Sequence, residues 1–270
     1  MRGFFSVRIF FFTISQIYDI IRYNNGILCC FGGFCLDSRF LRNEMLIGEE
    51  GLKKLAGASV VVFGVGGVGS SAIEGLARSG VGAITLVDSD SVDITNLNRQ
   101  LHAVSETVGE SKVKAMAERI LSINPKAKIT QMNLFYLPET ADEIDLAGFD
   151  YIVDAVDTVS AKIELAVQAQ KLSVPIISCM GTGNKLHPEL LRVTDIYKTK
   201  MCPLCRVMRR ELSKRGVSRL KVVYSEEPPL VPSFQPEGGS KRSVPGSMPF
   251  VPPAAGFLIA SQVVLDILAM

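Results

Sequence analysis

Residues 58–69 read ASVVVFGVGGVG, and this stretch decides the fold. Its first half, residues 58–63, is a continuous apolar run, which is typical of a strand buried on both faces of a sheet. Its second half is rich in glycine, and a stretch that suits a helix follows to about Ser79. The four glycines are Gly64, Gly66, Gly67 and Gly69. This order predicts a nucleotide-binding loop, because glycine lets the backbone approach phosphate and the helix N-terminus offers free N–H groups.

The alternation of strands and helices continues after this loop. A second buried strand is predicted over 83–87 and ends in Asp88, and a helix over 108–122 has its apolar residues on one face. Further strands are predicted over 128–132, 151–153 and 175–178, with a helix over 160–172 between the last two. The pattern predicts an α/β fold with a Rossmann-like, doubly wound, mainly parallel sheet. Ligands of such sheets bind beyond the carboxyl ends of the strands.

The alternation weakens after Asn184. A strand over 190–194, a basic helix over 202–215 and a strand over 220–224 are predicted next. Residues 226–253 contain eight prolines and predict a long mobile or functional loop. The chain closes with an apolar helix over 254–270, which fits a core or dimer helix better than a short membrane anchor. We therefore expect a nucleotide-binding domain over 37–184 and a C-terminal part of the same fold over 185–270.

Composition limits the class of protein. A net charge of +2 over 270 residues does not indicate a nucleic-acid or membrane protein as a whole. The six cysteines are irregularly spaced, which indicates free thiols in a reducing compartment. Residues 1–36 are apolar and aromatic but interrupted by Arg8 and Asp19. We expect a disordered or non-native extension there, with a membrane-associating segment or a cleaved signal as alternatives. We expect a cytoplasmic protein without integral membrane insertion, and peripheral membrane association stays open.

Polar residues after the second strand bear on which nucleotide is bound. The glycine loop and Asp88, which is placed to bind a ribose, suit NAD as well as ATP. Arg99 and Lys112 favour ATP, because attack on its α-phosphate builds negative charge that fixed cations stabilise. The alternative is that both are ordinary surface cations. Besides the glycines, the residues assigned to nucleotide binding are Asp88, Asp90, Asn96, Asn98 and Gln100.

Two aspartates close the strand predicted over 151–153. Asp154 is expected to have a structural role near the strand end. Asp157 lies at the carboxyl edge, where its carboxylate can hold Mg²⁺ with help from the phosphates. The alternative for Asp157 is the N-cap of the next helix. Arg99, Lys112 and Asp157 are therefore our candidates for catalysis.

In this order and spacing, the glycine loop, Asp88, residues 96–100, Lys112 and Asp157 resemble the adenylation domain of the ubiquitin-activating superfamily. Its bacterial members include the ThiF, MoeB and HesA-like proteins. The resemblance implies that the glycine loop holds the phosphates of ATP and that Arg99 and Lys112 contact them. It also implies a homodimer, in which Arg42 reaches the partner's site and takes part in catalysis. That role for Arg42 rests on the resemblance alone.

The segment over 198–221 separates branches of this superfamily. Sulfur-carrier adenylyltransferases usually hold zinc with two Cys-x-x-Cys pairs, but Cys202 and Cys205 form a single pair, so no zinc is expected. A redox or thioester role for this pair stays open, with simple packing as the alternative. The segment has nine basic residues against one acidic residue, which predicts a phosphate-backbone surface or a solvated helix face. The candidates for nucleic-acid contact are Arg206, Arg209, Arg210, Lys214 and Arg215.

Residues 181–188, 195–198, 206–212 and 245–252 resemble the bacterial tRNA threonylcarbamoyladenosine dehydratase group (TcdA or CsdL). The resemblance implies ATP-dependent cyclisation of threonylcarbamoyladenosine in tRNA through an acyl-adenylate, with ATP and Mg²⁺ as cofactors. It assigns residues 185–270 to tRNA binding and dimer support. A monovalent cation and a sulfur-relay protein partner stay open. The alternative function is an adenylyltransferase that activates the C-terminus of a ubiquitin-like sulfur carrier. Arg99 and Lys112 oppose an NAD-dependent oxidoreductase.

Overall fold

The computed structural model describes residues 38–235 and 244–270. The extension predicted over 1–36 lies outside the described residues. The chain divides into two compact units, Met1–Leu52 and Lys53–Met270. Helix α2 (Leu41–Gly57) contains a kink at Gly48, whose φ is 71°. No division falls near Asn184, and the boundary that we placed there stays a prediction.

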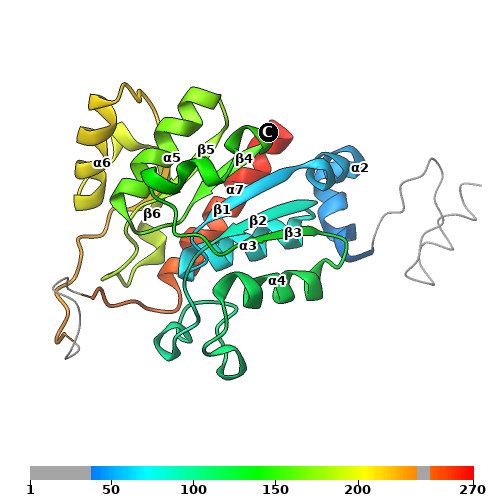
Figure 1. The fold of residues 1–270 in the computed structure, drawn as a ribbon, viewed down its shortest axis with the longest axis horizontal. Helices are drawn as coiled ribbons and strands as arrows, with labels where there is room; N and C mark the ends of the chain where they lie inside the picture. The colour runs from blue at the N-terminus through cyan, green and yellow to red at the C-terminus, as the bar shows by residue number, and fades with distance from the viewer. Residues whose placement is uncertain (1–37, 236–243) are drawn as a thin grey trace, which may run out of the picture. The chain divides into compact units, whose positions relative to one another are not determined.

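The second unit is built on one seven-stranded sheet, with the strand order β3-β2-β1-β4-β5-β7-β6 (Figure 1). All neighbouring strands are parallel except β6, which runs antiparallel to β7. This is the doubly wound, mainly parallel sheet that the sequence predicts, and the chain changes direction along the sheet between β1 and β4. The strands are β1 (Ser59–Phe63), β2 (Ala83–Val87), β3 (Lys128–Met132), β4 (Tyr151–Asp154), β5 (Ile176–Cys179), β6 (Leu191–Asp195) and β7 (Lys221–Ser225).

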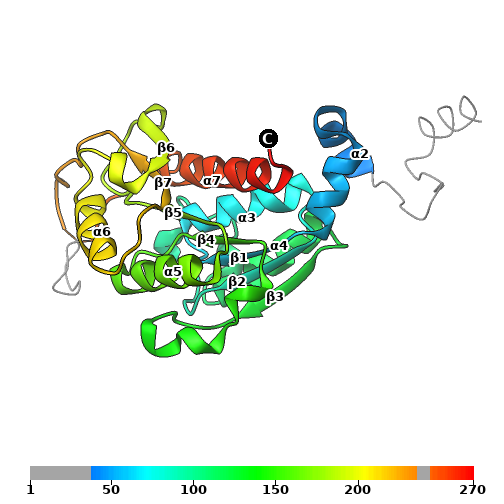
Figure 2. The same cartoon turned by 90° about the horizontal axis from the view of Figure 1, so that it is seen from above.

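Helices cover both faces of this sheet. Figure 2 shows α3 (Gly67–Ser79) and α7 (Val251–Leu268) on one face and α5 (Val159–Leu172) on the other. Helix α4 (Lys112–Ile123) packs beside α3, and α6 (Pro203–Lys214) packs beside α5. Short 3-10 helices occupy connections at Ser38–Phe40, Ile94–Asn96, Ser105–Thr107, Pro138–Glu143, Leu146–Gly148, Pro188–Leu190 and Ile196–Lys198.

The apolar run before the glycine loop is the centre of the core. Val60, Val61, Val62 and Phe63 have no exposed surface, as expected for a central strand covered on both faces. A Tyr136 ring packs edge-on against Phe63, with ring centroids 4.7 Å apart. Burial of such side chains contributes about 1.5–3 kcal/mol each, and it fixes where the strand ends and the glycine loop begins.

Helix α7 packs tightly along α3. A Cβ on Gly256 would lie 2.3 Å from the Val68 carbonyl oxygen, and a Cβ on Gly75 would lie 2.6 Å from the Ala260 Cβ. The two glycines therefore let the helix axes approach closely. Among the described residues, α7 is the one helix long and apolar enough to cross a membrane by length and composition. Its packing on α3 is that of a core helix.

Three predicted elements differ from the structure. The helix predicted over 108–122 begins only at Lys112, because Gly109 has a φ of 90° and Ser111 bridges Ser91. The closing helix begins at Val251, so Pro252 and Pro253 lie in its first turn, where a missing N–H is harmless. In α6, the spacing of Leu204, Val207, Met208 and Leu212 predicts an apolar face, but Val207 is exposed and the buried residues are Cys205, Met208 and Leu212.

Candidate nucleotide-binding site

A pocket of about 580 Å³ opens at the carboxyl ends of β1, β2 and β4. It is the place where a doubly wound sheet binds its ligand. Ten of the residues that we assigned from sequence line it: Gly64, Gly66, Gly67, Asp88, Asp90, Asn96, Arg99, Gln100, Lys112 and Asp157. A second pocket is bounded by Tyr151, Lys221 and Asp266, and none of the predicted nucleotide residues lines it.

The glycines of the loop have two structural roles, which the space around each glycine separates. Gly64 has a φ of 87°, and a Cβ there would lie 2.6 Å from the Ala155 carbonyl oxygen. A Cβ on Gly69 would lie 1.8 Å from the Gly64 carbonyl oxygen. A Cβ on Gly66 would meet nothing within 4 Å, and Gly66 is the N-cap of α3. Gly64 and Gly69 thus close the turn, while Gly66 faces open space in front of a helix N-terminus.

Asp88 ties the glycine loop to β2. Its Oδ2 accepts a hydrogen bond from the Val65 N–H at 2.6 Å, and its Oδ1 accepts one from the Asp90 N–H at 2.9 Å. The Gly64 N–H also donates to the Val87 carbonyl at 2.8 Å. The carboxylate is therefore fixed at the pocket wall, with its remaining lone pairs available to ligand hydroxyls.

Arg99 reaches the glycine loop from the segment after β2. Its Cγ lies 3.1 Å from the position of a Cβ on Gly67, and its Nη1 donates to the Thr95 carbonyl at 3.0 Å and the Asn98 Oδ1 at 2.8 Å. Partial burial lowers the pKa of the Arg99 guanidinium below its ordinary value, which still leaves it charged at neutral pH. A fixed cation thus lies beside the N-terminus of α3.

Lys112 brings a second cation to the same wall. It is the first residue of α4 and is 7% exposed. Its Nζ donates to the Asp90 Oδ2 at 2.7 Å, so Asp90 both lines the pocket and orients the ammonium group. A lysine at a helix N-terminus opposes the helix dipole by about 0.3–1 kcal/mol. An anion in the pocket would offset that cost.

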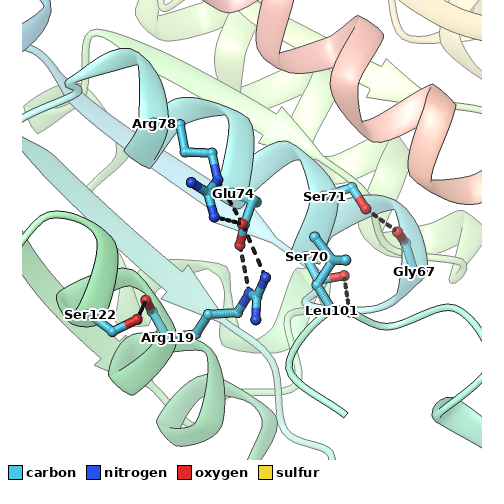
Figure 3. Close-up of polar contacts among 8 residues, drawn as sticks. All are labelled: Gly67, Ser70, Ser71, Glu74, Arg78, Leu101, Arg119 and Ser122. Carbon is cyan, nitrogen blue, oxygen red and sulfur yellow. Dashed lines mark hydrogen bonds and ion pairs between the residues drawn. The ribbon is translucent and has the colours of Figure 1, made fainter. Parts of the chain in front are cut away.

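Helix α3 holds the segments that carry both cations (Figure 3). The Ser70 Oγ accepts a hydrogen bond from the Leu101 N–H at 3.2 Å, which fixes the chain just after Arg99. The Glu74 carboxylate accepts from the Arg119 Nε at 2.6 Å and Nη2 at 3.1 Å, which ties α3 to α4. Burial raises the pKa of Glu74, but hydrogen bonds from Arg119 and Arg78 outweigh that effect and lower it overall.

Asp157 is exposed just beyond the end of β4. Its Oδ1 accepts a long hydrogen bond of 3.4 Å from the Thr158 Oγ1, which leaves most of the carboxylate's acceptor capacity for a ligand. Within 38–235 and 244–270, no three His, Cys, Asp or Glu residues are grouped to hold a metal ion. A single carboxylate together with phosphate oxygens suits Mg²⁺, which keeps several waters.

Asn98, Gly69 and Arg42 stand apart from the ten lining residues. The Asn98 Nδ2 donates to the Ser247 carbonyl at 2.9 Å, so Asn98 positions a loop rather than facing the pocket. Gly69 lies within α3 and serves packing. Arg42 is exposed in the first turn of α2, in the unit that ends at Leu52, and its role across a dimer stays a prediction.

The pocket also has walls that sequence reasoning missed. The proline-rich loop contributes Pro245, Gly246 and Ser247. Asn184, with a φ of 59°, holds this loop: its N–H donates to the Gly246 carbonyl at 2.7 Å, and its Oδ1 accepts from the Gly246 N–H at 2.7 Å. The signal in the sequence was the loop's proline density, which indicated a functional loop without placing it. Leu134, Phe135 and Tyr136 after β3 add an apolar wall.

A buried lysine was also missed. Lys162 of α5 is 1% exposed and lines the pocket. Its Nζ donates to both Asp154 carboxylate oxygens at 3.0 Å and to the Ser178 Oγ at 3.3 Å. Asp154 therefore has the structural role that the sequence indicated, and it joins the carboxyl ends of β4 and β5. Lys162 lies on the buried face of α5 together with Leu165, Ala166 and Ala169, so the helix periodicity held a signal that our sequence analysis did not use.

The basic helix α6 presents most of its cations to solvent. Arg206, Arg210, Lys214 and Arg215 are exposed, while the Arg209 guanidinium turns back and donates to the Thr199 carbonyl at 3.1 Å. Glu211 accepts hydrogen bonds from Arg215, Lys214 and Arg210, and these hold its pKa down to about 2. Four of the five candidates for nucleic-acid contact are therefore exposed, whereas Arg209 is half-buried and hydrogen-bonded to Thr199 within the fold.

The sheet, the glycine loop and the paired cations define a nucleotide-binding α/β protein whose pocket suits a polyphosphate. The sequence matches the ThiF family over residues 40–264, and the chain belongs to that family.

Curated relatives align with most of this sequence. It is 44% identical over 240 residues to the tRNA threonylcarbamoyladenosine dehydratase of Bacillus subtilis (strain 168), covering 85% of this chain and 94% of that protein. It is 38% identical over 202 residues to the Escherichia coli (strain K12) protein of the same name, covering 72% of this chain and 75% of the relative. The solved structure of E. coli TcdA in complex with ATP superimposes with a TM-score of 0.77 at 34% identity, covering 86% of this chain and 94% of that chain.

Proposed function

We propose that this protein is an ATP-dependent, AMP-forming dehydratase that cyclises threonylcarbamoyladenosine in tRNA. One observation carries the adenylation step of the proposal. Arg99 and Lys112 meet the open N-terminus of α3 in a single pocket at the topological switch point of the sheet. Relatives named for this activity span most of the chain, and one of them is solved with ATP.

Different parts of the pocket suit the phosphates, the ribose and the adenine of ATP. Phosphates fit in front of Gly66 and Gly67, where the helix N-terminus and Arg99 are nearest. The ribose hydroxyls fit Asp88, and the apolar wall of Leu134 and Phe135 suits the adenine ring. When bound through the phosphates, Mg²⁺ would neutralise charge on the leaving pyrophosphate, and Asp157 is the residue that would hold it.

The chemistry then needs electrostatics more than a protein nucleophile. The threonylcarbamoyl carboxylate attacks the α-phosphate, pyrophosphate leaves, and an acyl-adenylate forms. Arg99 and Lys112 stabilise the negative charge that builds on the phosphate oxygens during this attack. The carbamoyl group of the same substrate then closes onto the activated carbonyl and expels AMP. Both reacting groups belong to one molecule, so positioning supplies much of the acceleration.

The proposal also includes contacts with the tRNA and with a second subunit of a homodimer. Exposed cations of α6, chiefly Arg206 and Arg210, would contact the phosphate backbone of the tRNA. The protein would act as a homodimer in which Arg42 completes the partner's site. We propose a cytoplasmic localisation, where a tRNA substrate would be met.

The second candidate is an adenylyltransferase for the C-terminal carboxylate of a ubiquitin-like sulfur carrier. It shares the first half-reaction, so the pocket alone does not separate the two. The exposed cations of α6 favour a polyanionic substrate over a carrier protein.

One assay separates the candidates. The protein is incubated with α-labelled ATP, Mg²⁺ and either threonylcarbamoyladenosine-bearing tRNA, unmodified tRNA or a sulfur-carrier protein. We expect AMP to form only with the modified tRNA, and the nucleoside to lose the mass of one water. AMP release or pyrophosphate exchange that depends on the carrier instead would favour the second candidate. Arg99→Ala and Asp157→Ala should abolish AMP formation but leave tRNA binding intact.

A further inference from the structure

The Cys202-Pro-Leu-Cys205 pair is not used by the proposed reaction. Cys202 is the N-cap of α6 and Cys205 lies in its first turn. Both are free thiols, 8% and 0% exposed. Two cysteines three residues apart at a helix N-terminus are typical of thiol–disulfide chemistry, because the free N–H groups there stabilise a thiolate.

The surroundings of Cys202 suit a thiolate. Cys202 is the N-cap of α6, and its side chain lies in one buried cluster with Cys205 and Met180. Interaction with the Cys205 thiol lowers the pKa of Cys202 most, and with nearby backbone N–H groups it outweighs burial and brings that pKa to about 6. The same interaction, together with burial, raises the pKa of Cys205. A thiol of lowered pKa beside a protonated thiol is the arrangement in which a thiolate can attack a disulfide.

The backbone geometry allows the two sulfurs to join. Residues i and i+3 at a helix start have Cα atoms about 5 Å apart, and disulfides span Cα separations of about 4.4–6.8 Å. Met201, just before the pair, has a φ of 59°, which turns the chain sharply into α6. A Cys202–Cys205 disulfide therefore needs no large movement of the helix.

The pair has features that oppose a metal site. Two thiols are half of a zinc ligand set, and the described residues offer no third His, Cys, Asp or Glu beside them. Lys185 and Arg209 are charged groups that interact with the pair, and both are cations. Positive charge favours a thiolate and disfavours a metal ion.

The pair also touches the nucleotide pocket. Gly181 follows β5 and lines the pocket, and Leu204 between the two cysteines lines it as well. Cys202 and Cys205 share a buried cluster with Met180, which lines the pocket next to Gly181, and Leu204 packs against this cluster. Forming a disulfide would draw the Cys202 sulfur toward Cys205 and so disturb Leu204 and the packing against Met180 at the pocket wall.

We propose that Cys202 and Cys205 form a reversible dithiol–disulfide pair whose oxidation weakens nucleotide binding in the adjacent pocket. The oxidant is a low-molecular-weight disulfide such as oxidised glutathione. The Cys202 thiolate attacks one of its sulfurs and releases one thiolate. Cys205, losing its proton, then attacks the Cys202 sulfur of the mixed disulfide and releases the second. Two cysteine thiols are oxidised, and one disulfide is reduced to two thiols. The coupling to nucleotide rests on the proposed function, whereas the redox chemistry does not.

The experiment titrates the full-length protein with reduced and oxidised glutathione. Alkylation followed by peptide mapping locates each disulfide, and AMP binding is measured by calorimetry at each potential. We expect a Cys202–Cys205 disulfide to form as the ratio of oxidised to reduced glutathione rises over the range in which glutathione equilibrates with redox-active cysteine pairs. We expect the Kd for AMP to rise about 10-fold on oxidation, equal to about 1.4 kcal/mol, and to return with a reductant.

Two serine variants serve as matched controls. Cys202→Ser removes the attacking thiol but keeps a side chain that caps a helix well. Cys205→Ser keeps the attacking thiol and removes the second thiol that would join it. Both should bind AMP like the reduced protein when oxidised glutathione is absent. The AMP affinity of Cys202→Ser should not respond to glutathione, whereas Cys205→Ser should stop at the mixed disulfide on Cys202, which peptide mapping detects. A pair that stays reduced across this range, or that retains zinc after purification, would overturn the redox assignment. A mapped disulfide with unchanged AMP affinity would overturn the coupling. Failure of the dehydratase assay alone would leave both results standing.

Discussion

Gly66 and Gly69 stand three residues apart in one loop but differ in what an added methyl group would meet. A Cβ on Gly69 would collide with the Gly64 carbonyl at 1.8 Å, whereas a Cβ on Gly66 would face open space. We expect Gly69→Ala to destabilise the protein by about 3 kcal/mol or more, since backbone must move. Gly66→Ala should leave the denaturation midpoint nearly unchanged but weaken ATP binding, because the methyl would intrude where phosphate lies. Urea denaturation and calorimetry measure the two effects, and equal losses of stability would contradict this division.

Asp90 was assigned to the nucleotide, but its carboxylate holds Lys112. Asp90→Asn removes the charge and keeps the shape, so the Lys112 ammonium loses a charge-assisted hydrogen bond. We expect kcat/KM for ATP to fall about 10-fold, with little change in unfolding free energy, because Asp90 is exposed. Glu106→Gln, at an exposed acid of the same connection, is the control and should change neither quantity. An unaltered kcat/KM in Asp90→Asn would mean that Lys112 is positioned by its helix alone.

The sequence could predict those site residues that combine a telling residue type with a position at the end of a strand or the start of a helix. Gly64, Asp88, Arg99 and Lys112 each follow a strand or open a helix, and they line one pocket. Lys162 stands on the apolar face of α5, so its burial could have been predicted from helix periodicity. Its partners Asp154 and Ser178 could not, because they come from other strands and contacts between distant segments leave no local pattern.

At the scale of elements, α3 connects the glycine loop to both cationic segments. Glu74 in its middle is 4% exposed and binds Arg78 and Arg119. We expect Glu74→Gln to lower the free energy of unfolding at pH 7 by about 1–3 kcal/mol, because two arginines lose a charged acceptor. Chemical denaturation measures this effect. The exposed pair partner Glu118, changed to Gln, is the control and should change stability by less than about 0.5 kcal/mol.

The pH dependence of stability tests the same interaction. The pKa of Glu74 is lower in the folded protein than its model-compound value of 4.5. Its contribution is therefore fully present above about pH 4.5 and is lost as the pH falls through the lower folded value. Below that point the wild type and Glu74→Gln should approach each other in stability. A difference that stayed constant from pH 7 to the acid range would assign the effect to packing.

Strands were predicted more closely than helix starts. The strand over 83–87 matches β2 at both ends, since a buried apolar run has clear limits. The strand over 128–132 also matches β3 at both ends, although no residue of β3 is fully buried. The start of α4 was placed four residues early, because Val108 fits the apolar stripe although Gly109 and the Ser91–Ser111 bridge hold that stretch extended. The first turn of α7 was missed because proline density indicates a loop, although proline is favoured at the start of a helix.

At the scale of the whole molecule, the position of Arg42 relative to the pocket is a question of assembly. If Arg42 acts across a homodimer, Arg42→Ala and Lys112→Ala should each be inactive alone. Mixing equal amounts under subunit exchange should restore about a quarter of wild-type AMP formation, because half the dimers gain one complete site. A mixture that stays inactive, although sedimentation shows exchanged dimers, would place Arg42 outside the partner's site.

The surface of α6 decides whether the protein recognises tRNA as a polyanion. Each phosphate contact that is removed should reduce the slope of log K against log salt by about 0.7–0.9. We expect Arg206→Ala with Arg210→Ala to weaken tRNA binding and to reduce the slope by roughly 1–2. Arg209→Ala should instead lower stability, because its guanidinium is hydrogen-bonded to Thr199 within the fold. Lys114→Ala with Lys128→Ala removes two exposed charges from α4 and β3 and is the control of equal charge. Filter binding between low and moderate salt measures all of these. An equal loss of slope in the control would show that net charge, and not the α6 surface, governs binding.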